Sequence, residues 1–292
     1  MLAKSSRKTH SYLNVSVLQD AHRVRYASTE YPQRIRTGSF HMTRDLSHYK
    51  IEALDNGLRL LEAVAMQPGR TLTPLAEACG MTLSQAYRVA ATLQQSGYLT
   101  VDENKRYHLG LKCLKLGDAA THAIPLIQLA ADEMDFLARE TQESISLVVR
   151  EGLSRVTVDL RDSPHAIRVS APIGEHRPLH FGATGQCILA FSAPDVVDRA
   201  LAPPLGRATE FTDTDPNSIR ARLQQIRERK YHVAIRDYAD HAFAVGAPIQ
   251  SRAGDLVGAI SISGPLARFD DQREKRYVAL VTAAAARVSQ RL

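Results

Sequence analysis

Apolar residues recur at helical spacing between residues 50 and 66, and this periodicity predicts an amphipathic helix. The stripe on its apolar face consists of Ile51, Leu54, Leu58, Leu61 and Ala65. The pair Pro68-Gly69 follows and ends the helix, because proline and glycine both disfavour its continuation. This helix is expected to support the elements that come after it.

Capping residues mark a shorter helix directly afterwards. Thr73 is a favourable N-cap, and Pro74 suits the first helical position because proline lacks the N–H that would be unpaired there. Gly80 ends this helix, and another helix begins two residues later. Two short helices in succession predict a helix-turn-helix, whose second helix lies in the major groove of DNA.

The second helix is predicted from Thr82 to Gly97, and its two faces differ. Thr82 and Gln85 form a capping-box pattern, which pairs two backbone donors. The residues expected to face the core are Leu83, Ala86, Ala90 and Leu93. The residues expected to be exposed and to contact DNA are Ser84, Gln85, Tyr87 and Arg88. Arg88 suits guanine and Gln85 suits adenine, whereas Ser84 and Tyr87 suit phosphates or a thymine methyl group.

Two short apolar runs after Gly97 predict a β-hairpin with strands over 98–101 and 105–109. This hairpin would be the wing of a winged helix-turn-helix, with Lys105 and Arg106 near the DNA backbone. The alternative is a helical hairpin that packs only against protein, because a capped second helix also occurs there.

The rest of the chain alternates between the periods of strands and helices. Strands are predicted over 144–150, 155–160, 167–170, 243–249 and 256–263. Helices are predicted over 114–141, interrupted at Pro125, and over 184–191, 195–201 and 219–230, with a last helix capped by Asp270. Antiparallel strands with helices on their faces predict an α+β domain of the sensor type.

Charge is distributed unevenly over the 292 residues, whose formal net charge is +6. Residues 1–49 contain eight basic and three acidic residues, whereas 50–111 contain six of each. The predicted DNA-binding segment is therefore neutral, and specific binding would depend on geometry and dimerisation more than on a basic field. The net charge is not itself evidence for DNA binding.

Residues 1–46 show no sustained period, and we interpret them as a flexible basic extension, upstream of a natural start near Met42. A basic arm that contacts DNA is the alternative. The beginning of the chain has no apolar region typical of a signal peptide, and no run of apolar residues is long enough to span a membrane. Three scattered cysteines fit free thiols in a cytoplasmic protein.

Two segments of the second domain carry a family resemblance. Residues 172–191 read PIGEHRPLHFGATGQCILAF, and residues 247–265 read APIQSRAGDLVGAISISGP. Together with the helix-turn-helix and the sequence TLQQSGYL that follows it, they resemble the IclR family of bacterial transcriptional regulators over about residues 50–292. The resemblance implies a GAF-like effector domain, a dimer or dimer of dimers, and control of catabolic operons by small organic acids, often aromatic.

The resemblance also implies where the effector binds. Gly182 and Ala183 match a loop that borders the family pocket, and Ser261 and Ser263 match a strand that borders it. Small residues at a loop-to-helix junction expose N–H groups to a carboxylate, and the two serines alternate onto one strand face. The alternative is that the small residues permit close packing and the serines face solvent.

Three departures from the family pattern change the expected pocket. Gly185-Gln186 replaces the Gly-Lys of many members, an acidic effector contact of some members falls on Ala234, and a pocket cysteine falls on Ala244. The alanines predict a larger and more apolar pocket, which favours an aromatic carboxylate over a two- or three-carbon acid.

Basic residues outside these motifs supply candidate partners for the acid. Arg168, Arg177 and His180 are the candidates, although solvated charges at the two arginines and a structural hydrogen bond at His180 are the stronger interpretation. Cys187 near His180 suggests a nucleophile and base, but packing of a short helix explains it better. No zinc-type spacing, P-loop or dinucleotide motif is present, so no metal and no cofactor is expected.

The sequence therefore predicts a winged helix-turn-helix over 47–111, a linker helix over 112–124 and a GAF-like effector domain over 125–292. The function expected is that of a homodimeric or homotetrameric regulator that binds a palindromic operator in double-stranded DNA and responds to a small organic acid. The alternatives are an enzyme that processes a small acid, and a sensor that binds other proteins. A repressor and an activator are equally compatible with the residues.

Overall fold

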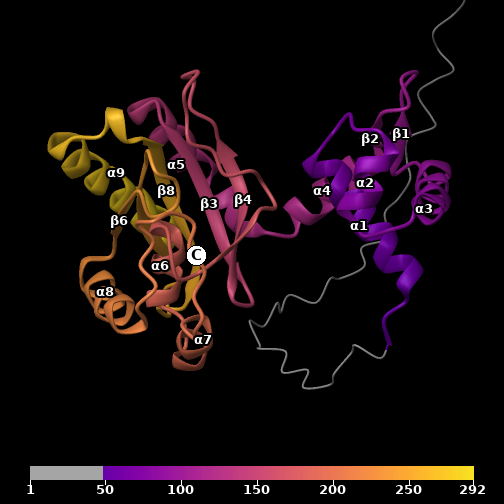
Figure 1. Ribbon diagram of the computed structural model, residues 1–292. Helices are drawn as coiled ribbons and strands as arrows, with labels where there is room; N and C mark the ends of the chain where they lie inside the picture. The colour runs from indigo at the N-terminus through magenta and orange to yellow at the C-terminus, as the bar shows by residue number, and fades with distance from the viewer. Residues whose placement is uncertain (1–48) are drawn as a thin grey trace, which may run out of the picture. The chain divides into compact units, whose positions relative to one another are not determined.

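The computed structural model describes residues 49–292, so the predicted extension over 1–46 and its alternative, the DNA-binding arm, lie outside the described residues. The chain divides into a unit of residues 1–55 and a unit of residues 56–292. Its elements are drawn in Figure 1 and are described below for each folded part separately.

The first folded part contains three helices and a two-stranded hairpin (Figure 1). Its elements are α1 (Glu52–Met66), α2 (Leu72–Ala78), α3 (Leu83–Gln95), β1 (Leu99–Val101) and β2 (Tyr107–Leu109). Leu60 and Val64 of α1, Leu75 of α2 and Ala86 and Ala90 of α3 are buried in one apolar cluster. The helix predicted over 50–66 is present as α1, but its predicted apolar face is wrong. Ile51, Leu54 and Leu58 are exposed, because the opposite side of the helix, with Leu60 and Val64, meets α2 and α3.

The predicted start of α2 is wrong. The N-cap is Thr71 rather than Thr73, and its side chain makes no capping hydrogen bond. Pro74 therefore occupies the third helical position, where the missing N–H still costs little because the first four N–H groups of a helix have no partner within it. Gly80 follows the helix with a φ of +63°, as its predicted role requires.

Two helices follow the hairpin, as the apolar spacing predicts. They are α4 (Lys112–His122) and α5 (Pro125–Thr141). Pro125 occupies the first helical position of α5, where proline is favoured, and it separates the two helices.

The second folded part is built on a six-stranded sheet. Its strands are β3 (Ser144–Glu151), β4 (Ser154–Arg161), β5 (His176–Pro178), β6 (His232–Ile235), β7 (Ala242–Gln250) and β8 (Leu256–Pro265). Their order is β5-β4-β3-β8-β7-β6, and every neighbouring pair is antiparallel. The central strands β3 and β8 come from the two ends of this part of the sequence.

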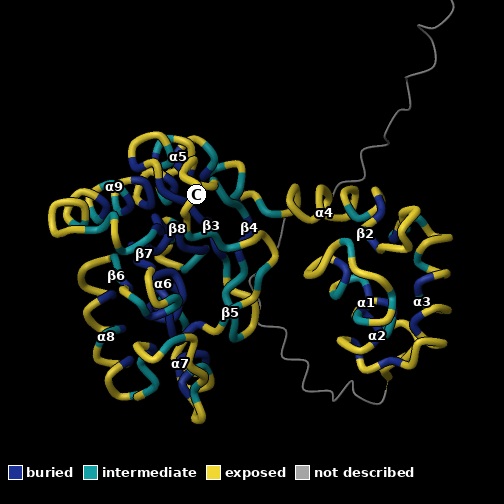
Figure 2. Tube along the Cα trace, turned by 45° about the horizontal axis from the view of Figure 1, so that its top comes forward, coloured by how far each residue is buried: buried dark blue, intermediate teal, exposed yellow. Residues whose placement is uncertain are grey.

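Helices cover both faces of this sheet (Figure 1). The helices are α6 (Ala183–Ala190), α7 (Pro194–Ala200), α8 (Pro216–Arg229) and α9 (Asp271–Gln290), with a short η2 turn (Leu266–Arg268) before α9. The apolar residues of α5 and α9 form one layer with the sheet, and those of α6, α7 and α8 form the other. In Figure 2 the buried chain runs through the sheet and α6, whereas the outer turns of α8 are exposed. This is the α+β arrangement that the sequence predicts.

One predicted strand is absent, and two observed strands were not predicted. Residues 167–170 form no strand; Arg268 donates a hydrogen bond to the carbonyl of Ile167, and Ser170 donates one to Asp162, so the segment is held as a loop. The pattern missed β5, which is only three residues long and ends at Pro178. It also missed β6, because Lys230 turns the chain out of α8 in a left-handed conformation (φ +61°) immediately before this strand.

Candidate functional site

The start of α3 is the candidate nucleic-acid surface. Thr82 accepts a hydrogen bond from the N–H of Gln85 at 3.3 Å, and Gln85 Oε1 accepts one from the N–H of Thr82 at 3.0 Å. The predicted capping box is therefore present, and it fixes the first turn of the helix. Ser84, Tyr87 and Arg88 are exposed on this turn and the next, as predicted.

Two details of α3 differ from the expectation. Leu83 is 54% exposed rather than in the core, because it is the first helical residue and extends beyond the core that Ala86 and Ala90 reach. The Oε1 atom of Gln85 also accepts a hydrogen bond from the Thr82 hydroxyl at 2.9 Å. A bidentate contact of Gln85 with adenine uses both Oε1 and Nε2, so it would require the cap to open.

The two predicted wing residues of the hairpin differ in their contacts: the Arg106 side chain is hydrogen-bonded, whereas Lys105 lies exposed. The Asp102 carboxylate accepts hydrogen bonds from the N–H groups of Arg106 and Asn104, and these donors hold the pKa of Asp102 below its ordinary value. Arg106 also donates from its guanidinium to the carbonyl of Gly69 at 3.0 Å, which ties it to the turn after α1. Lys105 lies at the exposed tip in a left-handed conformation (φ +58°).

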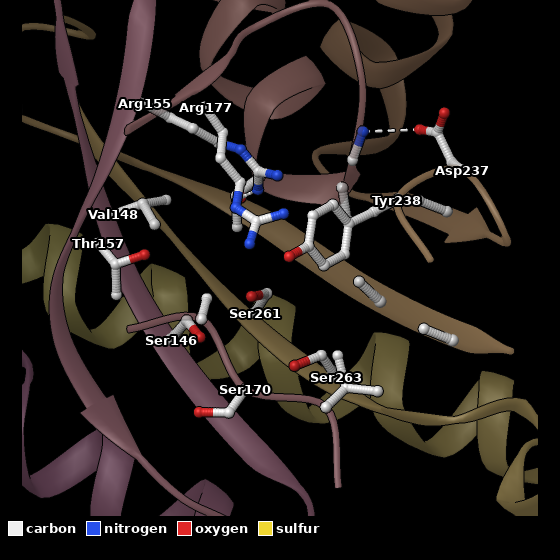
Figure 3. A pocket seen from close by; sticks show the side chains of 18 of the residues that line it. Ser146, Val148, Arg155, Thr157, Ser170, Arg177, Asp237, Tyr238, Ser261 and Ser263 are labelled. Atoms are coloured by element: carbon white, nitrogen blue, oxygen red, sulfur yellow. Dashed lines mark hydrogen bonds between the residues drawn. The ribbon is translucent and has the colours of Figure 1, made fainter. Parts of the chain in front are cut away.

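A pocket of about 650 Å³, counting its open mouth, lies against the six-stranded sheet (Figure 3). Six of the eight residues predicted to bind the effector line it: Gly182, Ala183, Ala234, Ala244, Ser261 and Ser263. Ser261 and Ser263 are buried on β8, which excludes the alternative that they face solvent. The family motifs thus bring together residues from α6, β6, β7 and β8.

His180 and Arg168, the other two predicted residues, do not line the pocket. His180 is buried, and its Nε2 lies 2.8 Å from the carbonyl oxygen of Gly206, which makes it a structural hydrogen-bonding group. Arg168 lies 3.7 Å from the Asp162 carboxylate and is largely exposed. For both residues the structural alternative stated above is the correct one.

The N-terminus of α6 is positioned by Gly182, whose φ of +75° suits glycine. The N–H of Gly182 donates to Asp237 Oδ2 at 2.6 Å, so the chain's own carboxylate uses the N–H that we expected for the ligand. Burial raises the pKa of Asp237, and the hydrogen bond from Gly182 opposes this rise. Asp237 thus places a carboxylate in the pocket, although Ala234 itself carries none.

Two arginines line the pocket, of which Arg155 was missed from the sequence and Arg177 was named only in the weaker of two interpretations. Arg155 of β4 and Arg177 of β5 both line it and are direct cross-strand partners. Burial, together with the neighbouring charge of Arg177, lowers the pKa of Arg155 to about 10, so the group stays protonated at neutral pH. Arg177 pairs with Glu175 and lies over the ring of Tyr238, 3.6 Å from its centroid. Arg177 was interpreted as a solvated charge, and this interpretation is wrong.

These side chains correct the predicted polarity of the pocket. Ala234 and Ala244 do line it, but Arg155, Arg177 and Asp237 make it charged rather than apolar. Arg155 on β4 and Asp237 after β6 lie outside the two segments that carry the family motifs, whereas Arg177 on β5 lies within the first of them. No signal in the sequence pairs β4 with β5, because the long loop between them has no hairpin pattern.

Two chemical alternatives from the sequence, a metal site and a nucleophilic Cys187, can be compared with the described residues. Residues 49–292 contain no group of three His, Cys, Asp or Glu residues that could hold a metal ion. Cys187 is buried, burial raises its thiol pKa, and its Sγ lies 3.4 Å from the carbonyl oxygen of Gly246. A thiolate nucleophile is therefore disfavoured at this position.

Comparison with known proteins decides the family. The model of the IclR helix-turn-helix domain matches residues 53–103, and that of the bacterial transcriptional regulator IclR C-terminal domain matches residues 118–290. The chain belongs to the IclR family. Its IclR relatives include KdgR of Escherichia coli (strain K12), 31% identical over 79% of this chain and 88% of KdgR, and the transcriptional repressor IclR of the same strain, 29% identical over 82% and 89%.

Solved IclR structures share the fold. The Thermotoga maritima IclR is 26% identical with a TM-score of 0.70, over 82% of this chain and 98% of that one. An IclR homolog from Microbacterium hydrocarbonoxydans, complexed with 4-hydroxybenzoate, is 23% identical with a TM-score of 0.72, over the same shares. The protein is therefore an IclR-type transcriptional regulator with a helix-turn-helix DNA-binding domain, and the relatives named here are regulators rather than enzymes. Among the described residues, no helix is both long and apolar enough to cross a membrane.

Proposed function

We propose that this protein binds a palindromic operator of a catabolic operon and that a small organic acid, held in the pocket of the α+β domain, controls this binding. The observation that carries the proposal is the capped N-terminus of α3, which presents Ser84, Tyr87 and Arg88 on one exposed surface. Because its partner is operator DNA, the proposal places the protein in the cytoplasm.

The DNA-binding part of the proposal gives each residue a role. Arg88 reads guanine through two parallel N–H donors, and Ser84 and Tyr87 contact phosphates or a thymine methyl group. Lys105 at the tip of the hairpin contacts the backbone, whereas Arg106 is already bound to the carbonyl of Gly69 and contributes through position. Gln85 contributes by holding the cap, which sets the direction of α3.

The effector part rests on the chemistry of the pocket. Two guanidinium groups favour an anion, and Val148, Phe243 and Ala244 supply apolar walls. The homolog from Microbacterium hydrocarbonoxydans is complexed with 4-hydroxybenzoate, so that protein of the same fold holds an aromatic acid. An aromatic carboxylate is therefore the effector class we propose.

Assembly is the third part of the proposal. A palindromic operator requires two α3 helices, so the active form is a homodimer or a dimer of dimers. Leu111, Leu114 and Leu116 are exposed at the beginning of α4 and provide apolar surface of the kind that oligomers bury. Sedimentation equilibrium of the full chain measures the state directly.

The test selects DNA from a randomised palindromic library with the full-length protein and measures affinity by fluorescence anisotropy. Arg88→Ala is expected to weaken binding about tenfold or more and to relax one base position, since a bidentate base contact contributes about 1–3 kcal/mol. Gln94→Ala, at an exposed position near the other end of α3, is the control and keeps its affinity. Selection of no sequence by the wild type, or equal affinity of Arg88→Ala, would contradict the proposal. Addition of aromatic acids to the bound complex then tests control by the effector.

A further inference from the structure

One side-chain contact joins the two edges of the six-stranded sheet across the pocket. β5 is the strand at one end of the strand order, and β6 is the strand at the other end. Arg177 of β5 and Tyr238, three residues after β6, both line the pocket, and Figure 3 shows the Tyr238 ring beside the guanidinium groups. The Arg177 guanidinium lies 3.6 Å from the centroid of this ring, a distance at which a cation and an aromatic face attract each other.

The Tyr238 side of this contact is firmly held. The Thr209 hydroxyl donates to the carbonyl of Arg236 at 2.6 Å, and the Thr212 hydroxyl donates to the carbonyl of Asp237 at 2.7 Å. The Asp237 carboxylate also accepts an N–H at the N-terminus of α6. Two other segments therefore fix the backbone that precedes Tyr238, so the contact can open only by movement of the other side.

The Arg177 side is weakly held. β5 has only three residues, and β4 is its one neighbour in the sheet. Residues 162–175, which connect β4 to β5, form neither helix nor strand, and residues 169–171 of this connection line the pocket. Among the described residues, 168–171 make no backbone–backbone hydrogen bond. A segment with so few bonds opens at a lower free energy than paired strands do.

The closed contact also leaves two polar atoms without a hydrogen bond. Arg177 pairs with Glu175, but among the described residues Arg177 Nε and Glu175 Oε2 are buried and have no partner. A buried polar atom without a partner is unfavourable, because it has lost its hydrogen bonds to water. The Arg177 side chain is 17% exposed, so a small movement of β5 brings water to both atoms. The free-energy difference between the closed and the open contact is therefore small.

We propose that Arg177 and Tyr238 form a gate, which holds the pocket closed and opens when β5 and the connection before it move away from Tyr238. The proposal rests on the proposed effector site only for its purpose, since the gate operates whatever the ligand is. Movement of a loop that closes a site commonly limits how fast a molecule enters and leaves it. The gate thus sets the rates of binding, whereas the rest of the lining selects the ligand.

The experiment measures opening without any effector. Ser261→Cys in the full-length protein places a thiol inside the pocket, where Ser261 is only 5% exposed. Peptide mass spectrometry then follows the alkylation of position 261 by iodoacetamide. Tyr238→Leu, added to this variant, removes the ring without a change of charge and is expected to accelerate the alkylation about three- to thirtyfold, the range that corresponds to a cation–π contact. Tyr238→Phe keeps the ring and should leave the rate unchanged.

Hydrogen exchange distinguishes a gate from a static wall. If the ring holds β5 in place, Tyr238→Leu increases the exchange of the amides of residues 168–177, whereas the loss of a wall alone leaves this exchange unchanged. The matched control is Phe191→Leu, which removes the ring of another cation–π pair. Lys230 Nζ lies 4.2 Å from the centroid of this ring, and neither residue lines the pocket. Phe191→Leu should change neither the alkylation rate nor the exchange.

Two results would overturn the gate. The first is an alkylation rate that Tyr238→Leu leaves unchanged, and the second is a faster rate without increased exchange of residues 168–177. Either result leaves the proposed effector site standing, because neither measurement involves an acid. If Ser261→Cys does not fold, as judged by circular dichroism, Ser263→Cys takes its place in the same pocket and the same two results decide.

Discussion

Removal of Arg268 is expected to destabilise the α+β domain strongly, because it leaves a buried charge without its partner. The side chain of Glu143 is only 2% exposed, and its two oxygens accept hydrogen bonds from Arg268 Nε at 2.7 Å and Nη2 at 2.6 Å. A Cβ atom on Gly264 would lie 2.4 Å from Glu143 Oε2, so the backbone of β8 closes over this carboxylate. Breaking one side of such a buried pair costs about 3–5 kcal/mol.

We expect Arg268→Ala to lower the free energy of unfolding by about 3 kcal/mol, the lower end of that range, because the Arg268 side chain is already 26% exposed to solvent. For a domain of this size, about 3 kcal/mol corresponds to a decrease in Tm of about 6–12 °C. The double variant Arg268→Met/Glu143→Leu removes both charges and is expected to lie within about 1 kcal/mol of the wild type, since apolar replacement of a buried pair is often neutral.

Urea unfolding followed by circular dichroism, with hydrogen exchange of the β3 and β8 amides, measures these differences. The control is Arg276→Ala, which breaks the exposed pair with Glu140 and should change stability by less than about 1 kcal/mol. The reasoning is refuted if Arg268→Ala is no less stable than the double variant. Arg268 also binds the carbonyl of Ile167, so Arg268→Ala should increase exchange in the loop that carries pocket residues 169–171.

Three further predictions concern local features. Thr82→Ala removes the capping box and should reduce the stability of the winged helix-turn-helix by about 1 kcal/mol in thermal unfolding. Gly110→Ala should destabilise the winged helix-turn-helix by about 1–3 kcal/mol, because its Cβ would lie 2.2 Å from the Gly97 carbonyl oxygen. The control is Gly117→Ala in α4, whose Cβ would meet no neighbour within 4 Å and which should be neutral or stabilising. The Glu151 carboxylate raises the pKa of His176. This pair therefore stabilises the fold below about pH 6.5, and its contribution is lost as the pH rises through the raised pKa. NMR titration should find a lower His176 pKa in Glu151→Gln than in the wild type. An unchanged pKa would show that the pair does not form in solution.

The sequence predicted those helix ends that are set by a hydrogen bond between neighbouring residues. Thr82 with Gln85 and Asp270 cap α3 and α9 as expected, because a capping side chain bonds to residues two or three positions away. The periodicity over 219–230 likewise predicted α8, whose buried residues are Ile219, Leu223 and Ile226. The cap predicted at Thr73 failed because the helix begins at Leu72, in line with the burial of Leu75 and Ala76, and not because the Thr71 side chain caps it.

The charged side of the pocket depends on contacts that no local pattern encodes. Arg155 and Arg177 meet only because β4 pairs with β5 in one particular register. Each arginine, taken alone on a polar strand, has the appearance of a solvated charge. Asp237 was missed because nothing near it in the sequence points to Gly182, and only the fold brings its carboxylate to the N-terminus of α6.

Arg155 of β4, Arg177 of β5 and Glu175 just before β5 carry much of the charge of the pocket, whereas the two apolar layers are packed between the sheet and the helices. Arg155, Glu175 and Arg177 belong to neither layer. Substitutions at Glu175 and Arg177 therefore alter the charge of the pocket without removing an apolar residue from either layer. Under the proposed control by an organic acid, a regulator built in this way can exchange one effector for another in few evolutionary steps while it keeps the same operator.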